Sequence, residues 1–130
     1  MIIQPNLQAW TLLLGRVLIA LIFVLSGIGK VFDFAGTAGY IASVGLPLAS
    51  VGVVVAIVVE LIGGLMLLAG YKTRLVALVV AAFTIVAAIL FHNNLADQMQ
   101  MIMFLKNLAI AGGLLFVAVF GPGRLSVDRG

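Results

Sequence analysis

The most constraining feature of the sequence is a run of apolar and small residues from Val51 to Gly70, interrupted by a single acid, Glu60. About twenty such residues in a helix match the ~30 Å hydrocarbon core of a bilayer at ~1.5 Å per residue. The run therefore predicts a membrane-spanning helix with Glu60 near the bilayer midplane. A carboxylate there must be paired, protonated or turned towards a polar cavity, and an intramembrane acid is by default a candidate functional residue.

The composition extends this prediction to the whole chain. Of 130 residues, 65% are hydrophobic and 8% are charged, and the mean hydropathy is +1.36. Soluble domains carry roughly 25% charged residues, so this composition is typical of an integral membrane protein. A chain of this length has room for about four spans, which predicts one transmembrane domain over residues 1–130. The net charge of +3 is scattered along an apolar chain without interleaved aromatic residues, so we expect a lipid bilayer and no nucleic acid as partner.

Four apolar stretches predict the spans of an all-α integral membrane four-helix bundle. We expect helices at about residues 9–32, 48–69, 75–91 and 99–120. The connector between the first two is rich in glycine, threonine and serine, and its apolar residues lie at helical spacing. This pattern predicts a short amphipathic helix, Thr37–Val44, at the membrane surface. Gly45 is expected to end this helix, and Pro47 to open the next one.

The charges outside the spans predict an orientation. Four spans place both termini on one side of the membrane, and four cations share that side: Lys72, Arg74, Arg124 and Arg129. The opposite side holds Lys30 at a helix end, together with Asp33 and Asp97. Because basic residues favour the cytoplasmic side, we expect both termini in the cytoplasm.

Residue types that are absent limit the chemistry. The chain has no cysteine and a single histidine, His92. Disulfides, thiol redox motifs, cysteine-ligated clusters and a bis-histidine haem within one chain are therefore excluded. We expect no metal site. Any redox role requires a quinone-like ligand, a partner subunit or ligands shared between chains.

Polar residues inside the predicted spans form the candidate site. Arg16 and Lys30 lie about four turns apart on one face of the first span, and Lys106 and Asn107 lie within the last. Charge balance predicts that Glu60 pairs with Lys106 or Arg16 across the bundle. Such a pair is either a structural latch that fixes the helix register or part of a ligand or proton site.

The same residues suggest which ligand would fit. Lys30, His92 and Lys106 map to one half of the bundle, where a cationic pocket above a buried acid would suit an anionic or carbonyl-bearing ligand such as a quinone head group. His92 could relay protons there. Two simpler interpretations stay open: the long side chains of Lys30 and Arg16 extend to their nearest interface, and His92 only caps a helix.

Small residues within the spans predict close helix packing. Glycine lets two backbones approach each other, and packing inside the chain is the first expectation, with packing between two copies as the second. The residues concerned are Gly27, Gly63, Gly64, Gly112 and Gly113.

The order and spacing of several short motifs carry a family resemblance. In chain order they are Arg16 with Gly27-x-x-Lys30, Gly36-Thr37-x-Gly39-Tyr40 with Gly45-x-Pro47, Glu60-x-x-Gly63-Gly64, Phe91-His92, Lys106-Asn107-Leu108 with Gly112-Gly113, Gly121-Pro122-Gly123 and Ser126-x-Asp128-Arg129. Together they resemble the DoxX family of small bacterial inner-membrane proteins.

The resemblance implies a four-helix fold in the bacterial inner membrane and an association with membrane redox complexes. The family takes its name from a subunit linked to thiosulfate:quinone oxidoreductase. Carried onto this chain, the resemblance makes six positions candidates for function: Arg16, Lys30, Glu60, His92, Lys106 and Asn107.

Three functions are compatible with these observations. The first is a subunit or accessory of a membrane redox pathway that binds a quinone or similar lipophilic ligand and works with a redox partner protein. The second is a small transporter or permeability factor for an anionic or proton-coupled solute, acting as a homo-oligomer because four short helices enclose little pore. The third is a non-catalytic scaffold that recruits a partner enzyme. None of them requires a catalytic centre within the chain.

Overall fold

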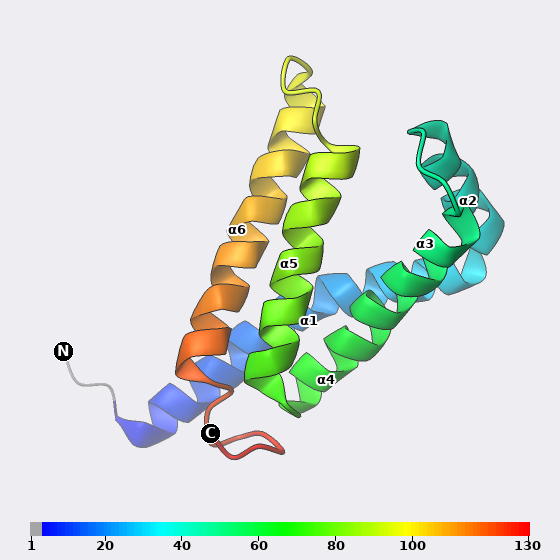
Figure 1. The fold of residues 1–130 in the computed structure, drawn as a ribbon. Helices are drawn as coiled ribbons and strands as arrows, with labels where there is room; N and C mark the ends of the chain where they lie inside the picture. Colours follow the sequence, from blue (N-terminus) through cyan, green and yellow to red (C-terminus); the bar gives the residue numbers. More distant parts are fainter. Residues whose placement is uncertain (1–3) are drawn as a thin grey trace.

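The computed structural model describes residues 4–130, and this part of the chain folds into helices joined by short turns (Figure 1). The elements are α1 (Pro5–Phe32), α2 (Phe34–Ser43), α3 (Ala49–Ile57), the π-helical turn η1 (Val58–Ile62), α4 (Gly63–Ala69), α5 (Thr73–Phe91) and α6 (Gln98–Phe120). Four helices are long and apolar enough to cross a membrane: Pro5–Phe32, Ala49–Ala69, Thr73–Phe91 and Gln98–Phe120. The predicted all-α class and its four spans are confirmed.

The short helix between the first two spans is also present, and it begins earlier than predicted. Asp33 separates α1 from α2, because its backbone angles are not helical. Its carboxylate accepts a hydrogen bond from the Gly36 amide at 3.2 Å. An aspartate in this N-cap position satisfies an amide that the first turn of a helix leaves free. As a result α2 starts at Phe34, immediately after the first span, and turns the chain back.

The second span contains an irregularity that the apolar pattern does not predict. Its α-helical geometry changes to a π-helical turn, η1, before it resumes in α4. A π-helical turn widens the helix locally and is frequent at functional sites. Glu60 is the central residue of this turn.

The second span ends at Ala69, the predicted last residue, and a glycine follows it. Gly70 adopts a left-handed conformation with a φ of 74°, and its amide donates to the Met66 carbonyl at 2.8 Å. This αL ending satisfies carbonyls at the helix end and is favoured by glycine, which has no Cβ. The next two spans begin at Thr73 and Gln98, one or two residues before the predicted starts.

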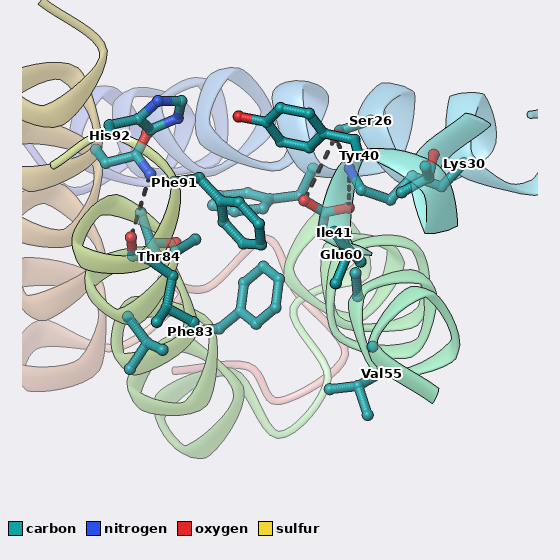
Figure 2. A pocket seen from close by; sticks show the side chains of 18 of the residues that line it. Ser26, Lys30, Tyr40, Ile41, Val55, Glu60, Phe83, Thr84, Phe91 and His92 are labelled. Atoms are coloured by element: carbon teal, nitrogen blue, oxygen red, sulfur yellow. Dashed lines mark hydrogen bonds and ion pairs between the residues drawn. The ribbon is translucent and has the colours of Figure 1, made fainter. Parts of the chain in front are cut away.

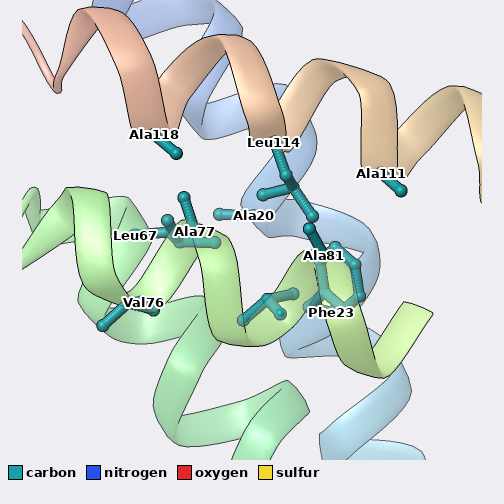
Figure 3. Close-up of a cluster of buried hydrophobic side chains, with 10 residues drawn as sticks. Ala20, Phe23, Leu67, Val76, Ala77, Ala81, Ala111, Leu114 and Ala118 are labelled. Atoms are coloured by element: carbon teal, nitrogen blue, oxygen red, sulfur yellow. The ribbon is translucent and has the colours of Figure 1, made fainter. Parts of the chain in front are cut away.

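The core lies where α1, α4, α5 and α6 meet, and half of its residues are alanine (Figure 3). It consists of Ala20, Phe23, Leu67, Val76, Ala77, Val80, Ala81, Ala111, Leu114 and Ala118. Four of the five predicted packing glycines lie against another helix. A Cβ on Gly27 would lie 2.7 Å from the Leu61 Cβ, and one on Gly64 would lie 2.9 Å from a Val24 methyl.

Gly112, the fifth of these glycines, does not pack against another helix of the chain as predicted. Nothing lies within 4 Å of a Cβ built on Gly112, whereas Gly63 approaches Val80 and Gly113 approaches Ile19. The reason is the position of α6, which packs mainly on α5 and leaves much of its surface outward.

The helices diverge towards one end of the molecule. Figure 1 shows α5 and α6 packed along their length, with α3 leading away from them towards α2. We call this end, which holds α2 and the α5–α6 loop, the α2 end. The start of α1 and the segment after α6 lie at the opposite end, which we call the C-terminal end.

Candidate functional site

Glu60 forms an ion pair with Lys30. The Lys30 Nζ lies 2.8 Å from Glu60 Oε2, and Glu60 is buried with 8% of its surface exposed. Ser26, one helical turn before Lys30, joins the two charges, because it accepts a hydrogen bond from Lys30 Nζ at 2.8 Å and donates one to Glu60 Oε1 at 3.3 Å (Figure 2). The acid and the base are therefore held by α1 and η1 together.

The prediction that Glu60 pairs with Lys106 or Arg16 was wrong. Lys30 lies on the part of α1 that meets Glu60, whereas Arg16 lies about four turns away on the same helix and α6, which carries Lys106, packs mainly on α5. Lys30 turns back along α1 towards Ser26, so it does not extend to the nearest interface as one interpretation allowed. The relative rotation of the helices decides the partner, and charge balance carries no information about that rotation.

The ion pair lies in the wall of a cavity of about 720 Å³ at the α2 end. This volume is within the range of small-molecule sites, which are mostly apolar with a few polar groups. The walls come from α1, α2, α3, η1, α5 and α6. Its polar and charged lining consists of Ser26, Lys30, Asp33, Thr37, Tyr40, Glu60, Thr84, His92, Lys106 and Asn107.

Aromatic rings bridge the cavity between α2 and α5. The ring of Tyr40 stacks on that of Phe91, with centroids 5.5 Å apart and planes inclined by 27°. No Cα atom of α2 lies within 8 Å of one in α5, although the structure describes both helices in full. Side chains rather than backbones therefore join these two walls, and Phe83 also faces the space between them (Figure 2).

His92 lies across the cavity from Glu60 (Figure 2). Its backbone amide donates to the Ala88 carbonyl at 3.0 Å, so it does end α5. Its side chain also lines the cavity, and Nδ1 is buried without a hydrogen-bond partner among the described residues. A buried ring nitrogen without a partner is unfavourable, so this nitrogen is open to a ligand or a water molecule.

Two more of the six candidate residues reach the same cavity from α6. Asn107 Nδ2 donates to the Thr84 carbonyl of α5 at 3.2 Å, and Lys106 Nζ lies 3.4 Å from the Met103 sulfur. With Lys30, Glu60 and His92, they bring five candidate positions to one cavity.

Arg16, the sixth candidate, belongs to the opposite end of the molecule. It is 3% exposed, and its guanidinium donates to the carbonyls of Pro122 and Leu125 in the segment after α6, and to that of Leu68 at the end of α4. The bond to Leu125 is 2.9 Å long and the one to Leu68 is 3.3 Å long. Arg16 therefore holds residues 121–129 against the bundle, and we call this segment the C-terminal clasp.

Asp128 fixes the other side of the clasp. Its carboxylate accepts hydrogen bonds from the Thr73 amide and hydroxyl, both at 2.8 Å, and from the Lys72 amide at 2.9 Å, at the start of α5. The Thr73 amide contributes most to lowering the pKa of Asp128 below its ordinary value, followed by the Thr73 hydroxyl.

The sequence analysis did not assign this role to Asp128, although Ser126-x-Asp128-Arg129 was among the motifs of the resemblance. Ser26 was also missed, and its i, i+4 spacing to Lys30 was the signal that could have found it.

The described residues offer no cluster of metal-binding side chains. In residues 4–130, no three residues among His, Cys, Asp and Glu come together in a way that could hold a metal ion. The nitrogen groups that line the cavity are instead two ammonium groups, an imidazole and an amide, which suit oxygen acceptors on an organic ligand.

The fold and the site define a class: a small four-helix membrane protein with an acid–base pair in the wall of a cavity between its helices. The chain belongs to the DoxX family, because the model of that family matches residues 11–93. The sequence is 42% identical to "Inner membrane protein YqjF" of Escherichia coli (strain K12), over 97% of this chain and 95% of that protein. It is 35% identical to "Inner membrane protein YphA" of the same organism, over 91% and 88% of the two chains.

A third relative bears a different name. The chain is 41% identical to "Putative oxidoreductase CatD" of Bacillus subtilis (strain 168), over 67% of this chain and 62% of that protein. No solved structure matches the chain.

Proposed function

We propose that this protein binds a quinone or a similar lipophilic ligand in the cavity beside Lys30 and Glu60, as a subunit or accessory of a membrane redox pathway. The observation that carries the proposal is the ion pair itself, which lies in the wall of a cavity of about 720 Å³. A latch that only fixed the helix register would be expected to lie between packed helices, without open space beside it.

The residues around the cavity fit the chemistry of a quinone. A quinone ring presents carbonyl oxygens, which accept hydrogen bonds, and an apolar plane that packs on aromatic side chains. Lys30 can donate at one side of the cavity, and the unpartnered His92 Nδ1 lies at the other. Tyr40, Phe83 and Phe91 supply aromatic surface between them. When bound, a quinone supplies electron and proton carriage, and the protein supplies binding and orientation.

The relatives support the setting of this proposal. Two are named inner membrane proteins, which supports placement in the bacterial inner membrane. A third carries an oxidoreductase name, which supports an association with redox chemistry. Because the chain has no cysteine and one histidine, we propose that a partner protein exchanges electrons with the ligand.

The packing at the C-terminal end favours a binding site over a passage through the chain. The hydrophobic core lies between the cavity and the C-terminal clasp. We further propose that this end faces the cytoplasm, because Lys72, Arg74 and Arg124 lie there.

Quantifying quinones that copurify with the protein tests the proposal. Wild-type protein extracted gently from bacterial membranes is expected to carry quinone, measured by liquid chromatography and mass spectrometry, and Glu60→Gln is expected to lose most of it. Asp97→Asn is the matched control, because Asp97 caps α6 at the same end of the molecule and does not line the cavity. Equal quinone content in all three proteins, or none in the wild type, would overturn the proposal.

A further inference from the structure

A second concavity lies at the C-terminal end, on the outer surface between α1 and α6. Its volume is about 240 Å³, and it is lined chiefly by Leu12, Gly15, Ile19, Phe116 and Phe120. The rings of Phe116 and Phe120 stack at 6.3 Å along one wall. Nothing lies within 4 Å of a Cβ built on Gly15, so this glycine leaves the groove open. In a bilayer, an apolar groove between two spans is covered by lipid.

One guanidinium group lines this groove, and two more lie at the same end of the molecule. Arg16 forms part of its wall and is 3% exposed, with Nε buried and unpartnered among the described residues. Arg74 lies beside Gly121, where a Cβ would be 3.0 Å from Arg74 Nη2. Arg124 donates to the Asn6 side chain at 2.8 Å, close to the start of α1. Glycine at position 121 therefore lets an arginine approach the end of the groove.

Cations outnumber acids at this end, where Asp128 is the acid beside Arg16. Within the described residues, the only ion pair is the one between Lys30 and Glu60 at the α2 end. Asp128 is the acid of the C-terminal clasp, and its carboxylate accepts three hydrogen bonds from Lys72 and Thr73. Arg74 and Arg124 are exposed, and a guanidinium carries five N–H donors. Their bonds to Val119 and Asn6 therefore leave donors free for an anion.

We propose that this groove binds an anionic phospholipid, with an acyl chain along α1 and α6 and the phosphate held by Arg74 and Arg124. Arginine is suited to phosphate because its planar fork donates two parallel hydrogen bonds. The positive charge of Arg16 in the groove wall adds to the preference for an anionic over a zwitterionic head group. The site lies at the opposite end from Lys30 and Glu60, so it does not depend on the ligand proposed for the cavity.

Occupying the groove with a side chain tests the acyl-chain part of the proposal. Gly15→Leu places an apolar side chain in the groove, and its Cβ has open space around it. Gly29→Leu is the matched control, because Gly29 has equally open space on the same face of α1, four turns away. Native mass spectrometry after titration with phosphatidylglycerol is expected to show at least fivefold weaker binding for Gly15→Leu and unchanged binding for Gly29→Leu.

Removing the two exposed charges tests the head-group part. Wild-type protein is expected to bind phosphatidylglycerol at least tenfold more tightly than phosphatidylcholine, and the double variant Arg74→Gln, Arg124→Gln is expected to lose this preference. Glycerol phosphate without acyl chains is expected not to compete at millimolar concentration, because the groove holds the chain. Equal binding of the two lipids by the wild type, or full binding by Gly15→Leu, would overturn the proposal. Competition by glycerol phosphate would overturn the acyl-chain part of it.

Discussion

The Lys30 Nζ of α1 lies 2.8 Å from the Glu60 Oε2 of η1, and the Ser26 hydroxyl forms hydrogen bonds with both side chains. The acid sits at the centre of the π-helical turn, in the wall of the cavity. The irregular turn and the ion pair are thus one structural feature, because the turn sets the rotation at which Glu60 meets α1. A helix without this turn would present residue 60 at a different angle.

The first prediction concerns the stability that the ion pair contributes. Removing one partner leaves a charge in an apolar environment, so Glu60→Gln and Lys30→Met are each expected to lower the free energy of unfolding. The free energy of unfolding of the double variant is expected to fall by less than the sum of the two single losses. The difference, which is the coupling energy between the two side chains, is expected to be about 1–3 kcal/mol. Unfolding in a denaturing detergent measures this double-mutant cycle. Additive losses would show that the two charges do not interact in the folded protein.

The second prediction concerns the close packing at Gly27. A Cβ there would lie 2.7 Å from the Leu61 Cβ and 2.8 Å from the Leu61 amide nitrogen, and the backbone cannot move aside easily. Gly27→Ala is therefore expected to lower stability by about 1–3 kcal/mol through overpacking. Gly29→Ala, two residues further on in open space, is expected to be neutral or to stabilise α1 by up to ~1 kcal/mol. Thermal unfolding of the two variants checks the contrast, and equal losses would contradict it.

The third prediction concerns the pH dependence of the C-terminal clasp. The hydrogen bonds from Thr73 and Lys72 lower the pKa of Asp128 below its ordinary value of 3.8. A carboxylate whose pKa is lowered by folding stabilises the folded state above the ordinary pKa, and the stabilisation is lost as the pH falls through the folded-state pKa. The clasp is thus expected to stay closed from neutral pH down to about pH 4 and to open at lower pH.

Hydrogen exchange at the Thr73 amide follows this opening directly. Asp128→Ala is expected to exchange rapidly at every pH, whereas the wild type exchanges rapidly only in acid. An unchanged exchange rate in Asp128→Ala at neutral pH would mean that the clasp is held by other contacts.

The fourth prediction concerns Arg16, whose side chain is buried and donates to three carbonyls. A lysine at this position keeps the charge, but its compact ammonium group cannot reach the same set of acceptors as a planar fork. Arg16→Lys is expected to lower stability by about 1–3 kcal/mol, because buried carbonyls are left without donors. Limited proteolysis after residue 121 is expected to increase. Wild-type stability and protection in Arg16→Lys would show that charge alone holds the clasp.

The spans and their ends could be predicted from the sequence, because hydropathy and glycine act locally. Gly70 ends the second span, and the apolar runs place the helices within a few residues of their observed bounds. Glu60 could be identified for the same reason, since a single acid in an apolar run is visible without knowing any contact. The observed α1 begins at Pro5, before the predicted start at residue 9, because proline is favoured in the first turn of a helix.

The partner of Glu60 and the clasp depend on contacts that local patterns do not contain. Lys30 meets Glu60 because η1 packs on α1, and neither the turn nor the packing has a signature in hydropathy. Residues 121–129 form no regular element, so nothing in their pattern predicts that Asp128 bonds to Thr73 or that Arg16 bonds to Leu125. The predicted pairing of Arg16 with Glu60 was therefore wrong, because Arg16 bonds to the clasp at the C-terminal end instead.

The most direct test of the central proposal is an equilibrium titration of a short-tailed quinone with the protein in zwitterionic nanodiscs. We predict saturable binding by the wild type and by Asp97→Asn. Glu60→Gln and Lys30→Met are predicted to bind at least tenfold more weakly, which corresponds to about 1.4 kcal/mol. Equal dissociation constants for the wild type and Glu60→Gln would contradict the account, because the ion pair would then have no part in the site.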